Sequence, residues 1–92
     1  MIKSWKHKGL QKFFETDSTK GIQSEHASKL RLRLEVLNRA KDVGELNFPG
    51  WHLHKLKGDR GTHWSIRVSG NWRITFEFVD GDAYITNYED YH

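Results

Sequence analysis

A chain of 92 residues is long enough for one small domain with a single hydrophobic core, and residues 1–92 are expected to form that domain. The absence of cysteine excludes disulfides and zinc–thiolate sites, and no apolar run is long enough to span a bilayer. Because no signal-peptide pattern opens the chain, we expect a soluble, cytoplasmic protein. The net charge of +3 is weak evidence for a nucleic-acid partner.

The first half of the chain is predicted to be mainly helical. Residues 1–6 alternate enough for a short edge strand, and residues 9–15 carry apolar side chains at helical spacing. After a polar loop over residues 16–21, Ser24 is the expected N-cap of a long helix that ends near Lys41. The apolar stripe of this helix comprises Ala27, Leu30, Leu34 and Leu37. Its cations are expected on the opposite side, where solvent or an acidic partner suits them better than RNA: Lys29, Arg31, Arg33, Arg39 and Lys41.

The last third of the chain is predicted to be a three-stranded antiparallel meander. Across residues 64–92, three runs of alternating apolar residues are separated by two turn signals. One of them, Asp80-Gly81, is a favoured two-residue hairpin turn. The register set by this turn opposes three pairs of residues: Phe78 and Ala83, Phe76 and Ile85, and Arg73 and Tyr88. Two helices followed by this meander predict an α+β domain, with the helices on one face of a mainly antiparallel sheet.

Side-chain alternation gives the meander one apolar and one polar face. A three-residue loop over residues 69–71 pairs Val68 with Trp72, and Arg67 with Arg73 on the polar face. Two like charges directly opposite each other repel, so they are either solvated beside acids or form a site for an anion. Continuation of the last strand adds three further residues to this face: Tyr88, Asp90 and His92.

Charge is unevenly distributed along the second half of the chain. Residues 51–73 hold five lysine and arginine residues against the single acid Asp59, whereas residues 77–92 hold five acids and neither lysine nor arginine. A basic patch with aromatic residues nearby is typical of phosphate binding, although many charge runs are only solvated faces.

Six histidines suggest acid–base or metal chemistry. His52 and His54 have a spacing seen in metal sites, but a metal needs a third ligand such as His63 or His92, and nothing in the spacing requires one. Metal-free cleavage of RNA fits the residue types better. The 2′-hydroxyl is then the internal nucleophile, and the protein supplies a base, an acid and positive charge.

Three segments resemble the HigB toxins of the RelE/ParE superfamily of bacterial toxin–antitoxin systems: LHKLKG (Leu53–Gly58), NWRITF (Asn71–Phe76) and NYEDYH (Asn87–His92). The resemblance covers the whole chain and implies a RelE-like fold. It also implies a ribosome-dependent endoribonuclease that cuts mRNA in the decoding site and needs no cofactor. The implied partner is a helix-turn-helix antitoxin, HigA, through which the toxin meets DNA only indirectly.

Matching the family's motifs position by position implies six catalytic residues: His54, Lys57, Arg73, Asp90, Tyr91 and His92. Neighbouring residues are expected to bind the RNA: Lys55, Arg60, Arg67, Asn71 and Tyr88. Lys55 departs from the proline of many relatives, which adds charge without touching a proton-transfer role. His54 and His92 share the roles of acid and base, with the assignment between them open.

The alternative is a binding toxin of the same fold without catalysis, either a ParE-like gyrase inhibitor or an RNA-binding module. His54 and His92 argue against it, because ParE-type members lack these histidines.

Overall fold

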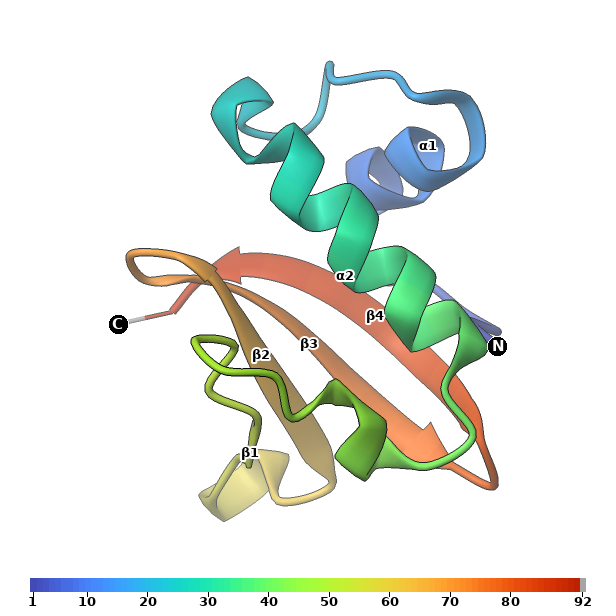
Figure 1. The fold of residues 1–92 in the computed structure, drawn as a ribbon, viewed down its shortest axis with the longest axis vertical. Helices are drawn as coiled ribbons and strands as arrows, with labels where there is room; N and C mark the ends of the chain where they lie inside the picture. Colours follow the sequence, from blue (N-terminus) through green and yellow to red (C-terminus); the bar gives the residue numbers. More distant parts are fainter. Residues whose placement is uncertain (92) are drawn as a thin grey trace.

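The computed structural model describes residues 1–91 and has an α+β fold (Figure 1). Over these residues it contains two α-helices, α1 (Lys8–Thr16) and α2 (Ala27–Arg39), and three short 3₁₀ helices: η1 (Ser24–His26), η2 (Val43–Leu46) and η3 (Gly58–Arg60). Four strands form one antiparallel sheet in the order β1 (His54–Lys55), β2 (His63–Ser69), β3 (Trp72–Val79) and β4 (Asp82–Asp90). The predicted α+β class and the antiparallel meander are confirmed.

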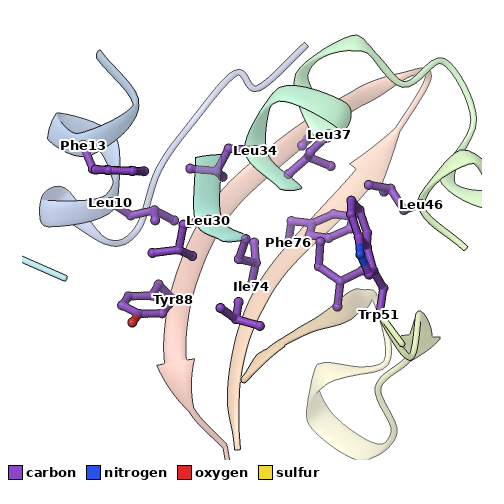
Figure 2. Close-up of a cluster of buried hydrophobic side chains, with 13 residues drawn as sticks. Leu10, Phe13, Leu30, Leu34, Leu37, Leu46, Trp51, Ile74, Phe76 and Tyr88 are labelled. Carbon is purple, nitrogen blue, oxygen red and sulfur yellow. The ribbon is translucent and has the colours of Figure 1, made fainter. Parts of the chain in front are cut away.

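The hydrophobic core lies between the helices and one face of the sheet (Figure 2). The stripe of α2 contributes Leu30, Leu34 and Leu37, each fully buried. Leu10 and Phe13 of α1 pack against the same cluster. The sheet supplies Ile66, Ile74 and Phe76. No helix within residues 1–91 has the length and apolarity needed to cross a bilayer.

The two helices begin differently from the prediction. His7 caps α1, because its Nδ1 accepts a hydrogen bond from the Leu10 amide at 2.9 Å. The predicted N-cap role of Ser24 is wrong, since Ser24 lies inside η1 and α2 starts at Ala27 without a side-chain cap. The helix ends at Arg39, close to the predicted end at Lys41.

The position of Arg33 also differs from the prediction. It was expected among the solvent-facing cations of α2, but it is buried. Its guanidinium carbon lies 4.6 Å from the centroid of the Trp51 ring, and its Nε donates to the Arg67 carbonyl at 2.8 Å. Burial, reinforced by the nearby charge of Arg67, lowers the pKa of Arg33. Arg33 therefore links α2 to the end of β2.

The hairpin of β2 and β3 confirms the predicted pairing of Arg67 with Arg73. The predicted pairing of Val68 with Trp72 is wrong, because a bulge between Arg67 and Ser69 brings Ser69 opposite Trp72. The turn is consequently tighter than predicted, and its Gly70 adopts the left-handed φ of 56° that a two-residue connection requires.

The hairpin of β3 and β4 starts in the predicted register and then departs from it. Phe78 pairs with Ala83 as expected, but a second bulge intervenes before Thr75, and Arg73 pairs with Glu89 instead of Tyr88. Ile85 lies in this bulge with a φ of 46°. A one-residue slip exchanges the faces of every following side chain. Beyond the bulge, Tyr88 and Asp90, which were expected on the polar face, therefore lie on the helix side.

The N-terminal segment accompanies this bulge. It runs parallel to β4 and forms bridges from Ile2 to Ala83 and from Trp5 to Thr86, so the predicted edge strand exists as two isolated bridges. The Ser4 side chain accepts a hydrogen bond from the Ile85 amide at 2.7 Å, and its carbonyl accepts one from the Thr86 amide at 3.1 Å. These contacts satisfy backbone groups that the bulge removes from the ladder.

Candidate active site

Polar side chains cross the face of the sheet opposite the helices in rows set by the strand register. One row contains His54, Ser65, Thr75 and Asn87, one residue from each strand. The next row contains Arg67, Arg73 and Glu89. Because paired residues project to the same side of a sheet, these seven side chains share one face.

A pocket of about 270 Å³ lies beside this face and is lined by His54, Lys55, Leu56, Lys57 and Tyr91. Tyr91 follows β4, and its amide donates to the carbonyl of Asn71 in the β2–β3 turn at 2.8 Å. The pocket thus unites residues from two distant parts of the chain. Four of them were predicted from the sequence, three as catalytic residues and Lys55 as a substrate-binding residue.

The geometry of His54 suits a proton acceptor. Its side chain is exposed, and its Nδ1 lies 2.9 Å from the carbonyl oxygen of His52. A carbonyl can only accept, so Nδ1 carries the hydrogen and the neutral ring keeps its lone pair on Nε2. Sequence periodicity did not choose between His52 and His54. In the structure His52 supplies its backbone carbonyl, and His54 lines the pocket.

Several cations surround the pocket and the arginine row. Lys55 and Lys57 are exposed, and the Lys55 ammonium lies 5.9 Å from the centroid of the Trp64 ring. Arg67 donates from Nε to the Gly70 carbonyl at 3.1 Å. Arg73 differs from these, because within residues 1–91 its solvent-shielded Nε and Nη1 have no hydrogen-bond partner. Unsatisfied donors are costly, so this guanidinium favours an incoming acceptor.

Arg60 and Glu89 form an ion pair on the same face. Arg60 donates from Nη1 to Oε1 of Glu89 at 3.0 Å and from Nη2 to Oε2 at 2.8 Å. These hydrogen bonds lower the pKa of Glu89 to about 2, and they raise the pKa of Arg60. Arg60 was expected to bind the substrate. Glu89 was not predicted as a site residue, because the predicted register placed it on the other face.

The bulge at Ile85 corrects the predicted placement of two candidates. Tyr88 is 3% exposed and packs in the core beside Ile74 (Figure 2). Its hydroxyl lies 2.6 Å from Nδ1 of His26. Burial raises the pKa of Tyr88 and leaves its ring no open face for a base. Asp90 pairs with Trp72 and so belongs to the helix side of the sheet.

Two candidates remain, Asn71 and His92. Asn71 is exposed in the β2–β3 turn, as predicted. His92 lies outside the described residues. Within residues 1–91, no group of three or more histidine, aspartate or glutamate side chains is arranged to hold a metal ion.

The fold and this site define a small, basic α+β protein in which a histidine, a tyrosine and several cations gather on an open sheet face. The family model of the RelE-like toxin of the type II toxin–antitoxin system HigB matches residues 3–92. Endoribonuclease HigB of Proteus vulgaris is 53% identical over 92 residues, which cover the whole of both chains. Toxin HigB-1 of Vibrio cholerae serotype O1 is 34% identical over 94 residues, which cover all of this chain and 98% of the relative. The chain belongs to the HigB family of RelE-like toxins, as its motifs predicted.

Proposed function

We propose that this toxin inhibits translation by cutting mRNA on the ribosome, through metal-free acid–base catalysis with the RNA 2′-hydroxyl as nucleophile. One observation carries the proposal: His54, with Nε2 available as a base, shares a pocket with Lys57 and Tyr91. Endoribonuclease activity is also what the name of the Proteus vulgaris relative states for that protein.

In the proposed reaction His54 removes the proton of the 2′-hydroxyl through Nε2. The 2′-oxygen attacks the adjacent phosphorus, the bond to the 5′-oxygen breaks, and a proton passes to that leaving oxygen. The products are a 2′,3′-cyclic phosphate and a 5′-hydroxyl. His92 is the proposed acid, although the reverse assignment of the two histidines satisfies the same balance.

Positive charge is needed where the phosphorane gathers negative charge. Lys57 is exposed in the pocket, and Arg73 carries donors that no described residue occupies. Tyr91 offers an exposed ring for a base, the role first considered for Tyr88. Two further cations and an amide are proposed to hold the flanking nucleotides: Lys55, Arg67 and Asn71.

The proposed enzyme depends on the ribosome, because its candidate site is a small pocket beside an exposed sheet face. A pocket of about 270 Å³ is too small to enclose an mRNA segment, and we propose that the ribosome holds the segment in register. Alignment of reacting groups is worth roughly 7–11 kcal/mol of barrier, and the ribosome would supply it. The proposed partners are accordingly the ribosomal decoding site, mRNA and a HigA-like helix-turn-helix antitoxin.

The test compares wild-type protein with His54→Ala and His52→Asn in a growing bacterium, with mRNA 5′ ends mapped after induction. Wild type and His52→Asn should create new ends phased to codons, because His52 contributes only its carbonyl and asparagine tolerates its φ of 49°. His54→Ala should create none at equal expression. Intact mRNA with arrested gyrase in the wild-type culture would instead favour the non-catalytic alternative.

A further inference from the structure

Glu89 has an unexpected position for an acid in a phosphate-binding site. It is the register neighbour of Arg73, and paired positions in a sheet bring their Cβ atoms to within about 5 Å. Aspartate and glutamate at such a distance normally pair with arginine and neutralise it. Yet Nε and Nη1 of Arg73 have no partner within residues 1–91.

The carboxylate of Glu89 is occupied by other donors. Arg60 binds both oxygens in a bidentate pair at 3.0 and 2.8 Å. The hydroxyl of Thr75 donates to Oε2 at 2.6 Å, and the amide of Asn87 donates to the same oxygen at 3.2 Å. Arg60 also donates to the Thr75 hydroxyl at 3.3 Å, which closes the network.

We propose that Arg60 is a positioning residue that holds Glu89 away from Arg73, so that Arg73 stays available to the RNA phosphate. This inference rests on the proposed function and reassigns Arg60, which the sequence placed among the substrate-binding residues. The network makes Arg60 the counter-ion of Glu89 and leaves Nε and Nη1 of Arg73 without a protein acceptor among the described residues.

The burial of the pair supports this division of roles. The side chains of Arg60 and Glu89 are 35% and 24% exposed, so solvent does not easily separate them. Glu89 is ionised throughout the working pH range, because Arg60 holds its pKa near 2. If Arg60 is lost, the carboxylate of Glu89 still carries its charge near neutral pH, because an ordinary glutamate pKa of 4.5 is well below 7 and Thr75 and Asn87 still donate to it. Arg73 is then the arginine paired with it across the strands.

The test is a double-mutant cycle in a ribosome-programmed mRNA cleavage assay. Arg60→Ala should reduce kcat/KM by about tenfold or more, because the carboxylate of Glu89 then pairs with Arg73 and neutralises its charge. Glu89→Gln should lose less than about threefold, and Arg60→Ala/Glu89→Gln should recover to within about threefold of Glu89→Gln. Equal loss in Arg60→Ala and the double variant would mean that Arg60 acts through a contact other than Glu89, either RNA or the Tyr91 ring 6.0 Å from its guanidinium, and would overturn the proposal.

A matched control separates local pairing from net charge. Glu77 is on the same face, paired with His63 and Tyr84, and makes none of the contacts of the Arg60 network. Arg60→Ala/Glu77→Gln has the same net charge as the rescued double variant, and it should remain as slow as Arg60→Ala. Rescue by Glu77→Gln would reduce the effect to long-range charge and overturn the proposal. The rescued variant leaves no unpaired carboxylate, so its activity also shows that folding is intact.

A second readout does not require the proposed function. The Nε–H signal of Arg73 is followed by NMR during titration with inorganic phosphate. Phosphate should shift this signal in wild type and in Arg60→Ala/Glu89→Gln, and about tenfold more phosphate should be needed in Arg60→Ala. If wild type cuts no mRNA, the proposed function fails, while this titration still decides the inference. An Arg73 signal that responds equally in all three proteins would refute it.

Discussion

Ile85 offers a direct test of the bulge that decides which side chains reach the site. Its φ of 46° is rare for a β-branched residue and costs about 1–2 kcal/mol. The side chain is 37% exposed, so its remaining burial contributes roughly 1–2 kcal/mol. In Ile85→Gly the strain relief and the lost burial nearly cancel. The extra backbone entropy of glycine then leaves a net cost of about 0.5–1 kcal/mol.

The same substitution at Ile66 is the matched control. Ile66 is fully buried in regular strand β2, where truncation leaves a cavity and glycine adds its entropy cost, at least about 3 kcal/mol together. Urea unfolding followed by tryptophan fluorescence measures both variants. If Ile85→Gly costs as much as Ile66→Gly, Ile85 is an ordinary strand residue, and the placement of Glu89 beside Arg73 is refuted.

Three further predictions concern polar groups that are buried or half-buried. Burial lowers the pKa of His7 below 6.5, so stability is complete above that pH and falls in acid as the unfolded chain takes up the proton. Urea titrations should show this loss in wild type and not in His7→Asn, which keeps the helix cap. Tyr88→Phe should cost about 1–2 kcal/mol in the same assay, because the buried His26 loses its partner; an unchanged midpoint would contradict the pairing. Glu89, with its pKa lowered from 4.5 to about 2, contributes roughly 1–2 kcal/mol after allowance for partial solvation. That contribution is present above pH 4.5 and lost towards pH 2, and Glu89→Gln should flatten the slope.

Local patterns were sufficient for much of the fold and for part of the site. Period-two alternation and the Asp80-Gly81 turn predicted the meander. The pairing of Arg67 with Arg73 came from the first turn, because apolar residues had to share one face, although the loop length assumed there was wrong. The choice of His54 over His52 came only from the family motif, since both positions fit a strand equally well. The structure brings His54 together with Lys57 and Tyr91, which the motif had grouped without any spatial argument.

The errors arise where distant parts of the chain act on local geometry. The bulge at Ile85 is held by Ser4, about eighty residues away, and no local rule of alternation includes such a partner. Arg33 was misplaced because helical periodicity treats any cation as solvent-facing. A ring such as Trp51 and a free carbonyl instead allow a guanidinium to be buried.

The second bulge has a chemical consequence for the site. In the regular register Arg73 would face Tyr88, and no carboxylate would lie opposite it. The slip instead sends Tyr88 to the core, where it pairs with His26, and brings Glu89 next to Arg73. That exchange stabilises the core, and it introduces an acid beside the cation that a phosphate needs. Because Arg60 already engages both oxygens of Glu89, the fold keeps the buried tyrosine without neutralising Arg73. In the proposed mechanism two cations that precede β2 therefore differ in role, which a charge count alone does not distinguish: Lys57 binds an anion and Arg60 shields one.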